Sequence, residues 1–223
     1  VHYASLRHFT GAGKFVDSYQ EDETTDFHTM VSEMADIPRK QAKTINLGLF
    51  YGMGKGKLMS QLGVNLETAS ELLASYNERV PFVKQLMNDT MNKAGKKGYL
   101  STLEGRRCRF DQWEPTNEWG QKSLPLAEAQ QQYGEHMIKR AWTYKALNRL
   151  IQGSAADQTK KAMLELDKEG YLAHIQVHDE LDFSVASDAD KAKIKDIMEN
   201  CVELAVPSKV DVECGDNWGD AGD

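Results

Sequence analysis

The sequence has few cysteines, no long apolar run and little proline. Its three cysteines, Cys108, Cys201 and Cys214, lie far apart in 223 residues and show no paired metal-ligand spacing. This argues against a disulfide framework and against a zinc site, so we expect reduced thiols. No stretch approaches the roughly 20 apolar residues that a membrane helix needs, and no signal peptide is indicated. We therefore expect a cytoplasmic protein with no membrane partner.

Positive charge is also scarce over the chain as a whole. The sequence has 27 lysines and arginines against 34 aspartates and glutamates, a formal net charge of −7, whereas a nucleic-acid-binding protein usually presents a basic face. The basic residues nevertheless cluster in two islands, over 39–57 and 96–109. Two local islands suffice for phosphate contacts, so the net charge does not exclude nucleic acid as a partner. With 40% hydrophobic residues, the chain can bury the core of one large domain or two subdomains.

Proline and glycine mark the ends of the helices that we expect in the first half. Asp36, two residues ahead of Pro38, predicts a helix start, because an aspartate can accept from free N–H groups and proline fits the first turn. This helix should end after Tyr51, where glycines follow at positions 52, 54 and 56. Helical spacing recurs in two further stretches, 66–80 and 81–98.

The second half mixes helices with strand-forming stretches. An irregular connector is expected over 108–124, where Trp, Pro, Asn and Gly are mixed. In the stretch AHIQVHDELDFSV, strand-forming residues flank a polar turn, which predicts a hairpin with His178 and Asp179 at its tip. The other elements expected are a helix over 126–147, a short helix after Gln152, a helix over 188–204 and a strand over 209–214.

One segment of the expected helices carries a row of functional side chains. Arg39, Lys43, Leu47 and Tyr51 recur every four residues, so they lie along one slowly drifting stripe of a helix. Arginine offers a planar fork for phosphate oxygens, lysine a point charge, and tyrosine a flat surface on which a base can stack. The stripe is suited to holding a nucleotide. A basic amphipathic surface helix is the alternative.

Six ordered blocks resemble those of family A DNA polymerases, the relatives of bacterial DNA polymerase I. The segment RKQAKTINLGLFYG resembles the motif on the fingers helix of that family. The other blocks are DFHT (26–29), TLEGRR (102–107), NRLIQGSAAD (148–157), QVHDE (176–180) and VECGDNW (212–218). The resemblance extends over nearly the whole chain. The connector over 108–124 is longer than the family pattern.

The resemblance implies an α+β fold with helical fingers and part of an antiparallel palm of a right-hand polymerase. Under it, residues 1–35 lead from palm to fingers, 36–100 form the fingers, and 101–223 form the C-terminal palm. The family's first metal-binding aspartate precedes this region, in a block that does not occur here. We therefore expect an N-terminally truncated polymerase that lacks the first palm strand and the thumb and is inactive by itself.

The resemblance also implies template-directed transfer of a nucleotide from a dNTP to a primer 3′-hydroxyl, by a mechanism that uses two metal ions. Asp179, with Glu180 beside it, would bind Mg²⁺ or Mn²⁺, since hard oxygen ligands suit these ions. A solvated turn is the alternative for this pair. Lys43 would contact the triphosphate and protonate the departing pyrophosphate, Arg39 would grip the γ-phosphate, and His28 would lie nearby.

Other residues are implied to contact DNA or the template base. Tyr51 would stack near the template base, or alternatively pack in the core, and Gly52 would let the backbone approach that base or merely end the helix. Asn148 and Gln152 would donate to minor-groove acceptors, or alternatively cap the helix or join a polar network. The remaining candidates are His178, at the primer phosphate or alternatively a satisfied turn histidine, and Arg106 and Arg107, on the duplex backbone or in an ordinary surface turn.

Two positions depart from the family pattern. Leu47 stands where most bacterial relatives carry phenylalanine or tyrosine against the sugar of the incoming nucleotide. Leucine there is associated with phage polymerases, which favours a viral origin and hence a host cytoplasm. Tyr144 stands where relatives carry arginine, with Lys145 next to it as a possible substitute.

Two other functions are alternatives to the DNA polymerase interpretation. One is a non-catalytic remnant that binds primer-template or nucleotide. The other is a single-subunit RNA polymerase, which shares a lysine-to-tyrosine helix and a His-Asp hairpin. Glu180 and the block QGSAAD favour the DNA enzyme over the RNA enzyme.

Overall fold

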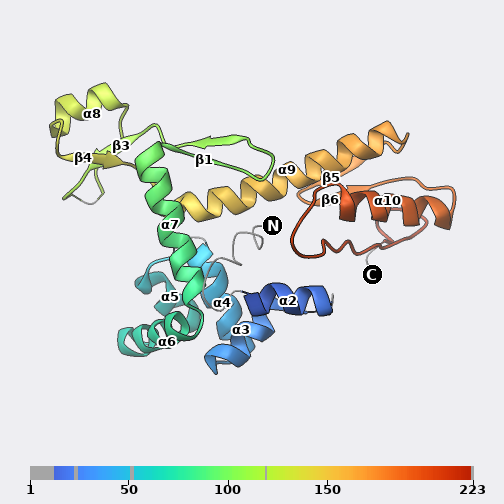
Figure 1. The fold of residues 1–223 in the computed structure, drawn as a ribbon, viewed down its shortest axis with the longest axis horizontal. Coiled ribbons are helices and arrows are strands. Elements are labelled where there is room, and N and C mark those ends of the chain that lie inside the picture. The colour runs from blue at the N-terminus through green and yellow to red at the C-terminus, as the bar shows by residue number, and fades with distance from the viewer. Residues whose placement is uncertain (1–12, 23–24, 51–52, 119, 222–223) are drawn as a thin grey trace.

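The computed structural model describes residues 13–22, 25–50, 53–118 and 120–221 (Figure 1). Tyr51 and Gly52, to which we assigned contacts with the template base, lie outside the described residues. The first part of the chain is helical. Its elements are α2 (Gly13–Glu21), α3 (Phe27–Ala35), α4 (Arg39–Phe50), α5 (Lys55–Leu62), α6 (Leu66–Arg79) and α7 (Pro81–Lys97).

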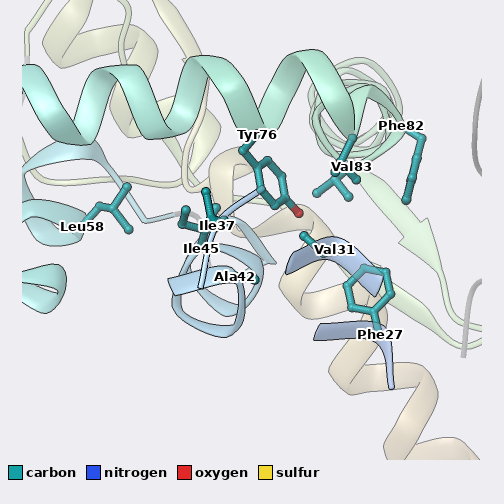
Figure 2. Close-up of a cluster of buried hydrophobic side chains, with 10 residues drawn as sticks. Phe27, Val31, Ile37, Ala42, Ile45, Leu58, Tyr76, Phe82 and Val83 are labelled. Carbon is teal, nitrogen blue, oxygen red and sulfur yellow. The ribbon is translucent and has the colours of Figure 1, made fainter. Parts of the chain in front are cut away.

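Helices α3 to α7 enclose the larger of the two apolar clusters found among the described residues, and Figure 2 shows it. Helix α4 contributes Ala42 and Ile45, both fully buried, because its apolar positions recur at helical spacing. Tyr76 points from α6 into this cluster, and its ring is fully buried. The other buried members are Phe27, Val31, Ile37, Leu58, Val80, Phe82 and Val83.

The helices expected over 66–80 and 81–98 are confirmed as α6 and α7. Asn65 caps the start of α6, where its side chain accepts from the Thr68 N–H at 2.8 Å. Pro81 occupies the first turn of α7, as its fixed φ allows. Helix α7 then ends at Gly98, which has a φ of 76°, a conformation that glycine adopts without strain.

The helix start assigned to Asp36 is wrong. Asp36 has a φ of 52° and ends α3, where its own N–H bonds to the Ser32 carbonyl. Helix α4 begins at Arg39, and the carbonyl of Pro38 accepts its first hydrogen bonds. Gly56, which we assigned to the end of α4, lies inside α5. Three glycines in close succession therefore do not mark a single break.

The second part of the chain has three two-stranded antiparallel sheets joined by helices. The strands pair as β1 (Tyr99–Ser101) with β2 (Arg107–Arg109), β3 (Trp113–Pro115) with β4 (Ile138–Arg140), and β5 (Ile175–Val177) with β6 (Glu180–Asp182). The remaining elements are α8 (Leu126–Tyr133), η1 (Thr143–Lys145), α9 (Ala146–Lys168) and α10 (Asp188–Asn200). Figure 1 shows α9 running from α7 toward β5, β6 and α10. This combination of helices and antiparallel strands is the expected α+β fold.

The helix expected over 126–147 is not continuous. Helix α8 ends at Gly134, which has a φ of 89°, and β4 follows because Ile138 pairs across the chain with Pro115. The connector over 108–124 likewise includes parts of β2 and β3, so it is not irregular throughout. Short strands of this kind are stabilised by partners distant in sequence, which the local pattern does not reveal.

Helix α9 begins at Ala146 rather than after Gln152. Gly153 lies inside it, and a Cβ there would come within 3.0 Å of the Thr102 methyl group. The glycine therefore allows close packing and does not break the helix. The hairpin with His178 and Asp179 at its tip is confirmed. Helix α10 begins where expected but ends at Asn200.

The strand expected over 209–214 is wrong, because the described residues there form no strand. The Val210 N–H bonds instead to the Glu199 carboxylate of α10 at 2.9 Å, and Val212 is largely exposed. All three cysteines are free, as expected. Among the helices of the described part, none is long and apolar enough to cross a membrane.

We predict that Tyr76→Phe lowers the free energy of unfolding by about 1–3 kcal/mol, because the buried Asn46 carbonyl oxygen loses the hydroxyl that donates to it. Denaturant unfolding measures this difference. Tyr133→Phe is the control, since the Tyr133 hydroxyl donates to the Lys122 carbonyl in an exposed setting and its loss should cost under about 0.5 kcal/mol. Equal losses in the two variants would contradict a special role for the Tyr76 hydroxyl.

Candidate active site

Helix α4 presents its functional row to solvent and its apolar face to the core. The Arg39 side chain is 56% exposed, Leu47 is 40% exposed, and Lys43 between them is exposed as well. Asn46, three residues after Lys43 and seven after Arg39, lies beside this row at the border of the apolar face and is fully buried. The four-residue spacing therefore gives the predicted stripe for its three described members.

Asp26 joins the start of α3 to the start of α4. Its carboxylate caps α3 by accepting from the His28 N–H at 3.0 Å and from the Thr29 hydroxyl at 2.8 Å. It also accepts from Arg39 Nε at 2.7 Å and pairs with Nη2 at 2.5 Å. Burial alone would raise the pKa of Asp26, but the hydrogen bonds from Thr29 and Arg39 outweigh it and lower this pKa to about 2. Asp26 thus holds the Arg39 guanidinium at the end of the row.

His28 lies beside this row and is held from behind. Its Nδ1 lies 3.1 Å from the Asn46 side-chain amide nitrogen, and the Tyr76 hydroxyl donates to the Asn46 carbonyl oxygen. Burial lowers the pKa of His28, and the charges of Arg39 and Lys43 lower it further against the opposing effect of Asp26. The neutral imidazole is therefore favoured close to two cations.

A second polar network fastens the 102–106 turn to α9. Arg106 Nε donates to Asp157 Oδ1 at 2.8 Å, and Arg106 Nη2 donates to the Gly153 carbonyl at 2.9 Å. The Leu103 N–H donates to the Ser154 hydroxyl at 3.0 Å. Burial alone would raise the pKa of Asp157, which is 8% exposed, but the Thr102 hydroxyl and the Arg106 guanidinium outweigh it and lower this pKa. The turn is thus anchored on one turn of α9.

The two arginines proposed for the duplex backbone have different surroundings. Arg106 is committed to Asp157 and Gly153, although half of its side chain stays exposed. Arg107 is exposed on β2, with its guanidinium 4.6 Å from the centre of the Tyr99 ring. The same turn therefore presents one anchored arginine and one exposed arginine.

The proposed minor-groove residues share one face of α9. Asn148 is half-buried and Gln152, one turn later, is exposed. At the position that departs from the family pattern, Tyr144 is exposed, and Lys145 lies 5.5 Å from the centre of its ring. Arg149 lies 5.0 Å from the centre of the Phe110 ring and donates to the Arg109 carbonyl at 3.3 Å. Arg149 thus links α9 to the end of β2.

The β5–β6 hairpin places His178, Asp179 and Glu180 at its exposed end. His178 has a φ of 54°, a left-handed conformation that side chains adopt at a cost. The Gln176 amide holds this turn by donating to the His178 carbonyl at 2.5 Å. Figure 1 shows the hairpin near α10, whereas α4 lies among the helices of the first part. The structure thus brings Arg39, Lys43 and His28 together, and His178, Asp179 and Glu180 together.

The two carboxylates of the hairpin are chemically suited to a divalent cation. Asp179 and Glu180 are adjacent carboxylates, and hard oxygen donors suit Mg²⁺ and Mn²⁺. Within the described ranges, no group of three or more His, Cys, Asp or Glu side chains could hold a metal ion. Mg²⁺ is commonly bound by one or two protein carboxylates together with substrate phosphates and water, so the donors present fit the protein's share of such a site.

The sequence reasoning missed the residues that hold the site in place. It did not single out Asp26, Asn46, Tyr76, Ser154 or Asp157. A signal existed for Asn46, because it falls beside Ile45 on the apolar face of α4 and a buried polar group needs a partner. No such signal pointed to Tyr76 as that partner.

The chain matches known DNA polymerases over nearly its full length. Residues 5–220 match the profile of the family described as DNA polymerase family A. The chain is 37% identical over 260 residues to a DNA-directed DNA polymerase of Pseudomonas phage M6, covering 98% of this chain and 36% of that protein. It is 31% identical to the thermostable DNA polymerase I of Thermus aquaticus, covering 96% of this chain and 25% of that protein.

A solved structure agrees with these sequence relatives. The POL domain of Pol1 from M. smegmatis, in complex with DNA primer-template and dNTP, superposes with a TM-score of 0.71 at 29% identity, covering 93% of this chain and 36% of that chain. This chain belongs to DNA polymerase family A. It spans 36% or less of the length of each of these three relatives.

We predict that Asp26→Asn removes an acid-sensitive part of the stability. Because the folded pKa is about 2, below the unfolded value near 3.9, the contribution is complete above about pH 4. It disappears as the pH falls through about 2. At pH 7 the variant should lose about 1 kcal/mol, a figure reduced for solvent screening because the Asp26 side chain is 36% exposed.

Denaturant unfolding of both proteins between pH 2 and pH 7 measures the effect. Glu33→Gln, which removes an exposed carboxylate from α3, is the matched control. A difference between wild type and Asp26→Asn that does not shrink on acidification would contradict the ion-pair explanation.

Proposed function

We propose that this chain carries the nucleotide-binding and C-terminal palm parts of a template-directed DNA polymerase. The observation that carries the proposal is the exposed row on α4, with Arg39 held by Asp26 and His28 held beside it by Asn46. The anchored Arg39, the exposed Lys43 and the His28 imidazole together offer donors for phosphate oxygens. Membership of DNA polymerase family A supports a dNTP as the ligand.

Under this proposal the row on α4 binds the incoming nucleotide. Arg39 contacts the γ-phosphate end, Lys43 contacts the triphosphate and donates a proton to the departing pyrophosphate, and His28 donates from the side. Leu47, an exposed aliphatic group one turn further, faces the sugar and has no hydroxyl to bond to it. Tyr51 stacks near the template base, and Gly52 allows the backbone to come close to that base.

The same proposal assigns DNA contacts to the second half of the chain. Asn148 and Gln152 donate to minor-groove acceptors of the primer terminus, which checks pair geometry without reading sequence. Arg107 contacts the duplex backbone, with Arg106 positioned beside it through Asp157. His178 contacts the terminal phosphate of the primer.

Asp179 and Glu180 would hold the divalent cations, Mg²⁺ or Mn²⁺, together with phosphate oxygens and ligands from elsewhere. When bound, such ions activate the primer hydroxyl and stabilise the negative charge that develops on the phosphates. The hairpin's contribution is to hold two carboxylates at a tight turn, which limits the motion of the ligands.

The proposal also covers the organisation of the chain. Residues 36–100 form the fingers and 101–223 the C-terminal palm, with residues 1–35 leading into the fingers. A longer polypeptide supplies a first palm strand with a further metal-binding aspartate. The resemblance to a phage polymerase supports a viral source, for which the host cytoplasm is the expected location.

Primer extension with Mg²⁺ and all four deoxynucleotides tests the proposal. This chain should be compared with a form extended by the upstream palm residues of the Pseudomonas phage M6 relative. We expect extension by the longer form. Asp179→Ala in that form should lower the rate at least about 100-fold and leave duplex binding within about twofold, because it removes a metal ligand and no phosphate donor.

Asp89→Ala is the control for that variant, since it removes an exposed carboxylate from α7. Normal turnover by Asp179→Ala would contradict the metal assignment. Duplex binding by both forms with extension by neither would favour a non-catalytic binding protein. A preference for ribonucleotides would instead favour an RNA polymerase.

We predict that Lys43→Ala weakens dNTP binding about 10-fold or more, as expected for the loss of a hydrogen bond between a charged donor and a phosphate. Binding of primer-template should change by less than about twofold. Equilibrium titration of a fluorescent dNTP and anisotropy of a labelled duplex measure the two affinities. Lys84→Ala, which removes an exposed lysine from α7, is the control. Equal loss of both affinities would indicate general DNA binding by Lys43.

A further inference from the structure

Three side chains from three helices form a hydrogen-bonded chain that ends at the candidate nucleotide site. The Tyr76 hydroxyl of α6 donates to Oδ1 of Asn46 on α4. Nδ2 of Asn46 lies 3.1 Å from Nδ1 of His28 on α3. Tyr76 and Asn46 are fully buried, whereas His28 is partly exposed. Figure 2 shows the Tyr76 hydroxyl at the inner end of the ring, within the apolar cluster.

The donors and acceptors in this series of hydrogen bonds determine which ring nitrogen of His28 carries the proton. An asparagine amide nitrogen only donates, and the amide oxygen only accepts. Because Oδ1 of Asn46 receives the Tyr76 hydroxyl, the nitrogen Nδ2 is left to face His28. Nδ1 of His28 must then accept, so it carries no proton. A neutral imidazole in this position has its proton on Nε2.

Nε2 is the ring nitrogen that Asn46 leaves available for a ligand. Burial lowers the pKa of His28, and the nearby charges of Arg39 and Lys43 lower it further against the opposing effect of Asp26. These effects favour the neutral ring, which has a single N–H donor. That donor can reach a phosphate oxygen only if it is on Nε2, because Nδ1 faces Asn46.

We propose that Asn46 and Tyr76 are positioning residues that present His28 to the nucleotide triphosphate as an Nε2–H donor. This inference rests on the proposed function for the identity of the ligand. The opposite orientation of the Asn46 amide would place Oδ1 against His28 and the proton on Nδ1. Buried polar groups in chains of this kind specify one arrangement when every member has its partner.

The position of the proton is measured directly by NMR. Long-range proton–nitrogen correlations of the ligand-free chain, with His28 assigned through His28→Gln, distinguish the two tautomers. We expect the Nε2–H form in the wild type. In Tyr76→Phe, Oδ1 of Asn46 loses its donor and can turn toward His28, so a mixture of tautomers is expected. A wild-type ring with its proton on Nδ1 overturns the proposal.

A double-mutant cycle tests the consequence for binding, with dATP and Mg²⁺ as the probe. Tyr76→Phe should weaken dATP binding about fivefold, the value of one ordinary hydrogen bond. A glutamine amide can donate from near the position of Nε2 without depending on Asn46, so His28→Gln provides the background in which the donor is not positioned by Asn46. Adding Tyr76→Phe to His28→Gln should then cause no further loss.

Tyr133→Phe is the control, and unfolding of each variant establishes that it is folded under the binding conditions. If Tyr76 only supported the fold, its substitution would weaken binding equally in both backgrounds, and that result overturns the proposal. If the wild-type chain binds no dATP while the NMR shows the Nε2–H tautomer, the proposed nucleotide site fails and the role in presenting a triphosphate donor fails with it. The hydrogen bonds that link Tyr76, Asn46 and His28 would then have a structural role only.

Discussion

The hydrogen bonds of the buried Asn46 amide are the contacts on which the proposed nucleotide-binding face depends. A buried amide without partners costs about 1–3 kcal/mol, so Asn46 is stable inside the apolar cluster only where His28 and Tyr76 meet it. This requirement fixes how α3, α4 and α6 pack against one another. Asn46 is buried on α4 one turn from Lys43 and two turns from Arg39, so its bond to His28 holds the imidazole beside these exposed cations.

In the second half of the chain, a buried polar side chain on α9 likewise depends on a partner from a distant segment. Asp157 is buried on α9 and is paired with Arg106, which also bonds to the Gly153 carbonyl. The 102–106 turn is thereby held against the helix that carries Asn148 and Gln152. In both halves a buried polar group, Asn46 or Asp157, supports residues that are proposed to contact substrate and lie at or near the surface. Burial favours the one packing arrangement in which these polar groups are paired, because a buried charge without a partner is costly.

The elements that could be predicted from the sequence are those with local determinants. Helix α7 has Pro81 at its first turn and Gly98 after its last, and the β5–β6 hairpin has a polar turn between two strand-forming stretches. The predicted secondary structure was wrong where contacts between residues distant in sequence determine the element. The chain over 126–147 divides because β4 pairs with β3, and α9 continues through Gly153 because that glycine packs against Thr102. Local periodicity carries no information about either partner.

The sequence by itself determined the family and the order of the functional blocks, and it placed Arg39, Lys43 and Leu47 on one stripe of α4, because helical spacing is a local property. Only the tertiary structure decided which buried polar groups support that stripe. Tyr76 is 30 residues from Asn46, and Arg106 is 51 residues from Asp157. Such pairs form when packing buries at least one partner, as it does Asn46 and Asp157, so they depend on the completed fold and not on either segment alone.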